Sequence, residues 1–345
     1  MKITDVRAIQ PVGQKSPPDW RTSLGQILVA IDTDCGITGY GVGGGGLAGI
    51  HVVKTVLRDL LLGQSPEDIS RLWDEMYQST LAFGRKGLAI MAISGVDLAL
   101  WDLKGKAEKV PVVSLLGGQP GQQLPTYCTV WNTQDLESID SHAGYKLHLG
   151  KVSNAGQQDE MIRAIETART LIGPDPLLMV DAWMKWTVES TVAISRAIEP
   201  FQIDWIEEPL SPDDLSGYAQ LSELSAVPIA GGEHEFTAAA FTQLIDQKLH
   251  KVLQPDVCWC GGMTELIKIY KMANRAGLRV CPHRGAEIWA LHAIAALDPH
   301  PLAETGRPWM TWVAGQPEID GGLISVTDRP GWGLTFDEQS LELVY

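Results

Sequence analysis

Short apolar runs alternate with longer amphipathic segments over the C-terminal two thirds of the chain. The apolar runs have the length of strands and lie at about 125–131, 144–149, 177–181, 203–206, 228–230, 250–253, 278–281 and 301–304. Helical spacing of apolar residues predicts helices between them, near 155–172, 187–198, 213–224, 236–245, 261–276 and 286–297. Eight strands that alternate with helices favour a parallel β/α barrel over an open sheet. The first crossover, 132–143, is short for a helix and the last helix is missing or displaced, so the pattern predicts an α/β fold, a modified (β/α)7β TIM barrel.

The N-terminal third of the sequence lacks this alternation. Strand-like runs dominate up to about residue 45, with 26–32 the clearest, and helical periodicity dominates over 50–115. Ser65, which precedes a proline, has the character of a helix N-cap, and Gly43–Gly49 that of a loop. The C-terminal residues are rich in turn signals and are expected to return to the first domain. The predicted parts are an α+β domain over 1–118, the barrel over 119–314 and a C-terminal segment over 315–345.

Composition narrows the class of protein. The 345 residues carry a formal net charge of −15, which disfavours a nucleic-acid partner because phosphate binding needs clustered Lys and Arg. The five cysteines match no zinc or disulfide framework and are expected to be reduced. No run reaches the roughly 18 apolar residues of a membrane span, and the N-terminus lacks the apolar stretch of a signal peptide. We therefore expect a cytoplasmic enzyme with a small-molecule substrate and no membrane partner.

Three acids end successive predicted strands of the barrel. Asp181, Glu207 and Glu233 are spaced by 26 residues in each step (207 − 181 and 233 − 207), about one β/α unit. Polar residues at the C-terminal ends of barrel strands converge on one mouth, where catalysis takes place. Three carboxylates there suit a hard divalent cation, with Mg²⁺ the default because it leaves positions open for substrate oxygens. The alternative is three unrelated structural acids.

Two further strand ends carry a possible acid–base pair. Asp256 follows the next predicted strand and His283 the one after it, so the two side chains are expected to be neighbours. Asp256 could then fix the tautomer of His283 and raise its basicity. The alternative is a structural histidine.

The opposite flank of the predicted mouth also carries ionisable groups. Lys146 and His148 share one face of the second strand because side chains alternate along a strand. A lysine on an inward face needs an anionic partner, which a substrate carboxylate or a metal-ligand acid would supply. His234 follows Glu233 directly, and Glu304 ends the eighth strand. Together these residues indicate metal-assisted abstraction of a proton next to a carboxylate.

The motifs around these residues resemble the enolase superfamily, in its mandelate racemase-like branch. They are most similar to the L-rhamnonate dehydratase subgroup of acid-sugar dehydratases. The matching segments are Ala92–Lys106, Leu115–Gly118, Leu178–Met184, Trp205–Leu210 (WIEEPL), Gly231–Glu235 (GGEHE), Leu253–Gly262 and Cys281–His283. The resemblance implies that the α+β domain caps the barrel. It also implies a symmetric homo-oligomer, often an octamer.

The resemblance assigns roles to individual residues. Asp181, Glu207 and Glu233 become Mg²⁺ ligands, and Asp256 and His283 the catalytic dyad. The remaining catalytic candidates are Lys146, His148, which replaces the second lysine of the superfamily's K-x-K pattern, and Glu304. The substrate-binding candidates are Arg21, Trp183, His234 and Gln254. The subgroup also has a longer N-terminal arm that brings a histidine over the substrate, and we expect no equivalent of it from the start of this sequence.

The predicted activity is that of an Mg²⁺-dependent acid-sugar dehydratase, a hydro-lyase that forms a 2-keto-3-deoxy sugar acid. Replacement of the second lysine by His148 favours a one-base mechanism, in which His283 removes the C2 proton and either His283 or His148 protonates the departing 3-hydroxyl. Two alternatives remain open: a racemase or epimerase of the same branch, and a catalytically silent metal-binding homologue.

Overall fold

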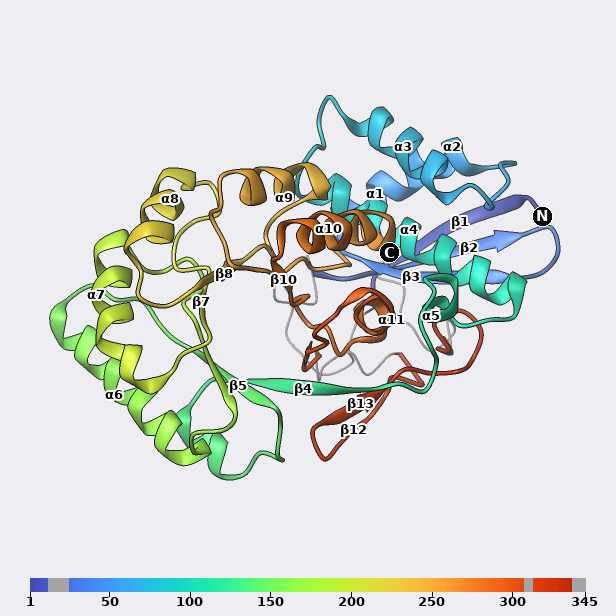
Figure 1. Cartoon of the computed structure of the whole chain (residues 1–345). Coiled ribbons are helices and arrows are strands. Elements are labelled where there is room, and N and C mark those ends of the chain that lie inside the picture. The colour runs from blue at the N-terminus through green and yellow to red at the C-terminus, as the bar shows by residue number, and fades with distance from the viewer. Residues whose placement is uncertain (12–24, 307–312, 337–345) are drawn as a thin grey trace.

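The computed structural model describes residues 1–11, 25–306 and 313–336 (Figure 1). The N-terminal domain opens with an antiparallel sheet in the order β1-β2-β3. Its strands are β1 (Ile3–Ile9), β2 (Ile27–Thr33) and β3 (Thr38–Gly43). The helices that follow are α1 (Gly46–Val52), the π-helix η2 (Val53–Leu57), α2 (Arg58–Leu61), α3 (Ile69–Thr80), α4 (Leu88–Glu108) and α5 (Val112–Leu115).

Helix α4 is the centre of this domain. It is apolar nearly all round, and most of its residues are buried. It packs directly on β3 because Gly39, Gly41 and Gly43 present no side chain to it. A Cβ atom at these positions would collide with backbone atoms of α4, including the carbonyls of Ala99 and Gly95. The glycines of β3 are thus required by close approach of the helix.

Two local predictions for this domain were wrong. The segment predicted as a loop at Gly43–Gly49 contains the start of α1 at Gly46. Helix α3 begins at Ile69, with Asp68 as the N-cap, whose carboxylate accepts a hydrogen bond from the Arg71 N–H at 3.2 Å. A carboxylate directly before the first turn of the helix therefore takes the role that Ser65 was predicted to have.

The second part of the chain forms a ring of eight parallel strands. They are β4 (Gln123–Val130), β5 (Gly144–His148), β6 (Leu177–Asp181), β7 (Trp205–Glu207), β8 (Ile229–Gly231), β9 (Val252–Leu253), β10 (Arg279–Val280) and β11 (Ala303–Glu304). Each pairs with its neighbour in sequence from β4 to β10, and β11 pairs with β4. No strand pairing joins β10 to β11 in the described residues, although the Cys281 thiol beyond β10 lies 3.6 Å from the Leu302 carbonyl before β11. The predicted (β/α)7β class is confirmed.

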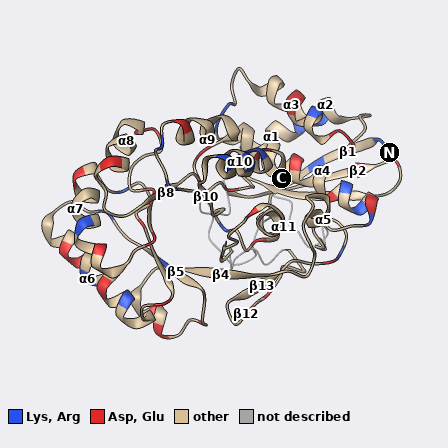
Figure 2. Ribbon diagram, in the orientation of Figure 1, with Lys and Arg blue, Asp and Glu red and all other residues tan. Residues whose placement is uncertain are grey.

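Helices cover the outside of the ring (Figure 1). They are α6 (Ala155–Ile172), α7 (Val188–Ile198), α8 (Leu215–Leu224), α9 (Thr237–Asp246), α10 (Gly262–Ala276) and α11 (Ile288–Leu297). The short first crossover holds a 3-10 helix, η3 (Thr133–Glu137), and a second one, η4 (Glu199–Phe201), follows α7. Acidic and basic positions are interspersed along the outer helices α6, α7 and α8, which present these charges to solvent (Figure 2). The inside of the ring is filled by a separate apolar cluster: Tyr127, Met179, Trp205, Ala230, Val252, Cys281 and Leu302.

The last described segment contacts both parts of the chain. Strands β12 (Ile319–Asp320) and β13 (Leu323–Ser325) form a hairpin, and β13 pairs antiparallel with β4. Beyond it the Trp332 N–H donates to Asp102 on α4 at 2.8 Å, and the indole N–H donates to the Leu98 carbonyl at 3.0 Å. The exact division at residues 118 and 314 stays a prediction. No helix in the described ranges is long and apolar enough to cross a bilayer.

A buried histidine predicts how stability depends on pH. His292 of α11 is fully buried, and its Nδ1 accepts a hydrogen bond from the Val113 N–H at 2.8 Å. Burial lowers the pKa of His292 to about 3, against roughly 6.5 in the unfolded chain. The unfolded state therefore binds more protons below pH 6.5, so stability is fully present above that pH and falls as the pH decreases. Because of this histidine, the free energy of unfolding is expected to be about 2 kcal/mol lower at pH 5 than at pH 8.

The variant His292→Gln tests this dependence. Glutamine can still accept a hydrogen bond from the Val113 N–H but does not titrate. The melting temperature of the variant should therefore fall less between pH 8 and pH 5 than that of the wild type. His51→Gln, an exposed histidine on α1, is the control. An equal pH-dependent loss in wild type and His292→Gln would contradict the assignment.

Candidate active site

A cavity of about 620 Å³ opens at the C-terminal ends of the parallel strands. Most of the residues predicted for the site line it: Lys146, His148, Asp181, Trp183, Glu233, His234, His283 and Glu304. Glu207, Gln254 and Asp256 do not line it but are buried and contact residues of the site. Arg21 lies outside the described residues. The strand ends of the barrel thus bring together side chains that are up to 158 residues apart (304 − 146).

Strand register places the first acids beside one another. His148 is the ladder partner of Asp181, and Asp181 is the partner of Glu207. The Asp181 carboxylate lies 2.9 Å from His148 Nδ1 and accepts the Trp183 N–H at 2.8 Å. The carboxylates of Asp181, Glu207 and Glu233 are all buried, with residue exposures of 7%, 2% and 8%.

Lys146 links the acids across the floor of the cavity. Its Nζ lies 2.7 Å from Glu207 and 2.7 Å from Glu304. Burial disfavours the charged ammonium, but the nearby carboxylates outweigh it and hold the pKa of Lys146 above its ordinary value. Burial raises the pKa of Glu207 to about 8, with Lys146 opposing and Asp181 adding to the rise. The cluster therefore holds more carboxylates than its one lysine can neutralise.

The predicted dyad is formed. His283 Nδ1 lies 3.0 Å from the Asp256 carboxylate, whose other oxygen accepts the Cys258 N–H at 2.8 Å. On the opposite side of the imidazole, His283 Nε2 lies 2.9 Å from Glu233 and 3.1 Å from Nε of Arg284. Burial lowers the pKa of His283, and Arg284 adds to this, but Glu233 and Asp256 raise it to about 10. Nε2 can donate to Glu233 when protonated or accept from Arg284 when neutral, and both groups lie within hydrogen-bond distance of it.

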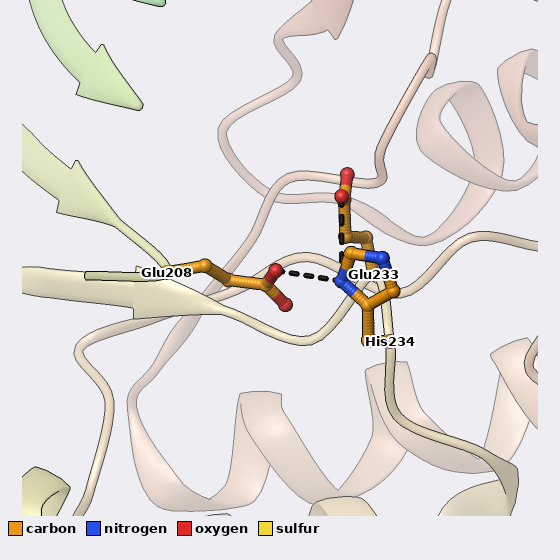
Figure 3. Close-up of side chains that lie close together, drawn as sticks. All are labelled: Glu208, Glu233 and His234. Carbon is orange, nitrogen blue, oxygen red and sulfur yellow. Dashed lines mark hydrogen bonds and ion pairs between the residues drawn. The ribbon is translucent and has the colours of Figure 1, made fainter. Parts of the chain in front are cut away.

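A second acid–histidine group lies beside the first acids. His234 Nδ1 is 2.7 Å from Glu208 and 3.4 Å from Glu233. Figure 3 shows how the imidazole of His234 lies between the two carboxylates. Burial lowers the pKa of His234, but the hydrogen bond to Glu208 and the charge of Glu233 raise it to about 9. One ligand atom from each of the three residues lies within 4.8 Å of the others, so they could hold a metal ion. Among the described residues, no group of three that includes Asp181 or Glu207 comes this close. Glu233 belongs to this set as well as to the set predicted from spacing.

The preference of Mg²⁺ for oxygen ligands favours the set of metal ligands that the spacing of the acids predicts. Asp181, Glu207 and Glu233 offer only carboxylate oxygens, the ligands that Mg²⁺ prefers, whereas His234 offers a nitrogen. Glu208 also already accepts the imidazole of His234. Several buried acids lie near a single lysine, and a divalent cation would reduce the repulsion between their carboxylates.

Several residues of the site were not anticipated. Glu208 follows Glu207 directly. Because successive strand residues face opposite sides, a role different from that of Glu207 could have been predicted for it. Arg284 lines the cavity beside His283, and its backbone N–H donates to Glu304 at 2.8 Å. Trp131 and Trp259 line the cavity too. Their only sequence signal is that each comes within a few residues of a strand end.

Gln254 has a different place from the one predicted. It is 1% exposed and absent from the cavity lining, and its amide donates to the Glu207 carboxylate at 2.5 Å. This contact would orient Glu207 rather than a substrate. Trp183 and His234, by contrast, line the cavity as the substrate-contact assignment requires.

Two family models match successive parts of the chain. Residues 20–117 match the model described as the N-terminal domain of mandelate racemase / muconate lactonizing enzyme. Residues 134–340 match the model described as enolase C-terminal domain-like.

Individual relatives include three kinds of enzyme. An L-rhamnonate dehydratase of Saccharopolyspora erythraea is 33% identical over 343 residues, covering 93% of this chain and 88% of the relative. The crystal structure of 3,6-anhydro-D-galactonate cycloisomerase from Zobellia galactanivorans is 28% identical, with a TM-score of 0.89, over 99% of this chain and 98% of that one. A racemase from Streptomyces coelicolor A3(2), solved with bound magnesium, is 31% identical, with a TM-score of 0.86, over 98% of both chains.

Proposed function

The chain belongs to the enolase superfamily, with the two domains of the mandelate racemase and muconate lactonizing enzyme family, and from this premise we propose that it is an Mg²⁺-dependent acid-sugar dehydratase. The resemblance inferred from its motifs is confirmed at this level. The proposed reaction removes the C2 proton of a sugar acid and eliminates the 3-hydroxyl, which gives a 2-keto-3-deoxy acid. Similarity to an L-rhamnonate dehydratase over 93% of the chain supports this class of reaction.

One observation carries the proposal. His283, Asp181 and Glu233 line one cavity, with His283 2.9 Å from Glu233. Asp256 and Glu207 are buried behind them, in contact with His283 and Lys146. A base beside an oxygen-rich cation site is the arrangement that proton abstraction next to a carboxylate needs.

The metal would be held by Asp181, Glu207 and Glu233. When bound, Mg²⁺ would neutralise the negative charge that the substrate carboxylate gains as the proton leaves. A cation at Glu233 would also compete with the imidazolium of His283 for the same carboxylate. That competition would leave the imidazole neutral, as a base must be.

Residues of the protein would then carry out the individual steps of the reaction. His283 Nε2 takes the C2 proton, and Asp256 steadies the imidazolium through Nδ1. Electrons from the broken C–H bond form the enediolate, which Lys146 and Glu304 are placed to contact from the cavity. The C3–O bond breaks as His283 returns the proton to the hydroxyl, which leaves as water. The resulting enol then tautomerises to the 2-keto acid.

His148 is placed to orient Asp181 rather than to act as a second base. Its Nδ1 contacts the Asp181 carboxylate at 2.9 Å, and its ring lies against the indole of Trp131, with centroids 4.1 Å apart and ring planes tilted by 48°. Both contacts restrain the imidazole. This supports a one-base mechanism through His283.

Turnover in D₂O tests the reaction type. A library of acid sugars incubated with Mg²⁺ and the protein is expected to yield, from at least one acid, a product that reacts as a 2-keto-3-deoxy acid. Deuterium should appear at C3 of the product, where the enol takes up its new proton. Recovered substrate that is inverted and deuterated at C2, without keto acid, would instead establish a racemase or epimerase.

The racemase alternative has one observation in its favour. His148 lines the cavity from β5, across the ring of strands from His283, where a second base of a two-base racemase would stand. The similarity to the Streptomyces coelicolor racemase agrees with it. A protein that binds Mg²⁺ but leaves every acid unchanged would point to the catalytically silent homologue.

A further inference from the structure

One lysine in the wall of the cavity has no carboxylate partner. The lysine and arginine side chains that line the cavity, among the described residues, are Lys146, Lys185 and Arg284. Lys146 lies 2.7 Å from two of the buried acids, and Arg284 donates to His283 at 3.1 Å. Within the described ranges, the ammonium group of Lys185 forms no ion pair, and its close contact is the indole of Trp183. The reaction proposed above makes no use of Lys185.

The turn after β6 holds Lys185 on the side of the proposed cation. Its backbone N–H donates to the Ala182 carbonyl at 3.1 Å. The two preceding residues, Trp183 and Met184, have φ of +42° and +60°, in the left-handed region that non-glycine residues rarely adopt. The Trp183 N–H donates to the Asp181 carboxylate at 2.8 Å, which fixes the start of this turn. Backbone strain of this kind persists where the surrounding structure holds it, and it is concentrated at ligand sites.

The ammonium group is positioned before any ligand binds. Lys185 Nζ lies 5.1 Å from the centroid of the Trp183 ring, within the roughly 6 Å of a cation–π contact. This contact restrains a long side chain but uses none of its N–H donors in an ion pair. Less freedom is therefore lost when an anion binds. The side chain is also half-buried, so that its charge is screened less by salt than that of a fully exposed lysine.

The ligand that suits this group is a single carboxylate. An ammonium group donates and cannot accept, and its hydrogen bonds to an ionised oxygen are roughly twice as strong as those to a neutral hydroxyl. The net charge of −15 makes the protein as a whole repel an anionic substrate, and a cation in the cavity offsets that repulsion locally. Phosphate sites, by contrast, usually combine several donors from arginine side chains or a helix N-terminus. Lys185 supplies one charge.

We propose that Lys185 binds the terminal carboxylate of a sugar diacid and so selects a linear substrate that carries a carboxylate at each end. This rests on the proposed function for the other end, where the first carboxylate meets the cation. The reaction itself is unchanged. The C2 proton and the 3-hydroxyl leave as water and the enol tautomerises, while the terminal carboxylate keeps its bonds. The product is a 2-keto-3-deoxy diacid.

Matched pairs of linear acids test the role of Lys185. D-Glucarate differs from D-gluconate, and galactarate from D-galactonate, only in a terminal carboxylate in place of a CH₂OH group. Binding is measured by calorimetry with Mg²⁺-loaded His283→Asn protein, which removes the proposed base so that the acids are not consumed. In at least one pair the diacid should bind at least about tenfold more tightly than the monoacid. Lys185→Gln in the same background should reduce that preference to less than about threefold, and Lys185→Arg should restore most of it.

The controls separate this contact from a general effect of charge. Lys151 is an exposed lysine that follows β5 and lies outside the cavity lining, so Lys151→Gln should leave the preference unchanged. The Mg²⁺ affinity of Lys185→Gln should match that of its parent, which would show that the turn still presents Asp181.

Three outcomes would contradict the proposal. Diacids that bind no more tightly than their monoacids, or that keep their preference in Lys185→Gln, would overturn the role of Lys185 and leave the dehydratase proposal standing. Tighter binding of 6-phospho-D-gluconate than of either diacid would assign the subsite to a phosphate instead of a carboxylate. Binding of no acid at all would overturn the diacid subsite together with the proposed function.

Discussion

Replacement of His283 by asparagine is expected to lower kcat at least about 1,000-fold, because the proposed mechanism uses this side chain both to take the C2 proton and to return one. Asparagine keeps a polar group that can hydrogen-bond Asp256, so the local packing is largely retained. The measurement is kcat at saturating Mg²⁺ on whichever acid the screen identifies, together with exchange of the C2 proton in D₂O. Exchange should fall with turnover, because both need the same base.

His148→Asn is the matched control on the opposite flank. If His148 only orients Asp181, the variant should bind Mg²⁺ about 10- to 100-fold more weakly but recover most of its kcat when Mg²⁺ is saturating. His283→Asn, by contrast, should not recover at any Mg²⁺ concentration. Loss of kcat in His148→Asn that saturating Mg²⁺ does not repair would make His148 a second acid–base group and favour the two-base racemase.

Repetition along the chain explains why the barrel could be predicted. Every strand expected in the barrel is found within a few residues of its predicted position, as are its helices; α6, for example, spans Ala155–Ile172 as predicted. Parallel strands buried on both faces have near-continuous apolar runs, which stand out against amphipathic helices. The N-terminal domain has no such repeat. Its helix start at Asp68 and the helix in the glycine-rich segment depend on tertiary packing, which local patterns do not report.

The candidate site was predictable to the extent that strand ends determine it. Asp256 and His283 are 27 residues apart and meet at 3.0 Å because adjacent parallel strands end side by side. The sequence does not tell which way a side chain turns once it reaches the mouth. Gln254 turns under Glu207, and Arg284 turns onto His283 in a backbone conformation with φ +54°. Such orientations follow from packing around the site and not from spacing.

The neighbouring acids Glu207 and Glu208 offer the sharpest test of where the metal binds. Both are buried, but Glu207 contacts Lys146 on the cavity side, whereas Glu208 contacts His234. Glu207→Gln keeps the shape and removes one anionic ligand of the proposed set. It is expected to weaken Mg²⁺ binding at least about 100-fold and to abolish turnover, because Mg²⁺ binds through few carboxylates and each contributes strongly. Calorimetric titration with Mg²⁺ gives the affinity independently of activity.

Glu208→Gln is the control that decides between the two sets of ligands. If Asp181, Glu207 and Glu233 hold the metal, Glu208→Gln should bind Mg²⁺ within about tenfold of the wild type, since it changes only a contact next to the ligands. The set Glu208, Glu233 and His234 predicts the reverse order, with Glu208→Gln the weaker binder. Mg²⁺ should also raise the melting temperature of wild type and Glu208→Gln but not of Glu207→Gln, because only a protein that binds the ion in its folded state is stabilised by it. Mg²⁺ binding by Glu207→Gln at the wild-type affinity would exclude Glu207 as a ligand, and with it the site on which the proposed reaction depends.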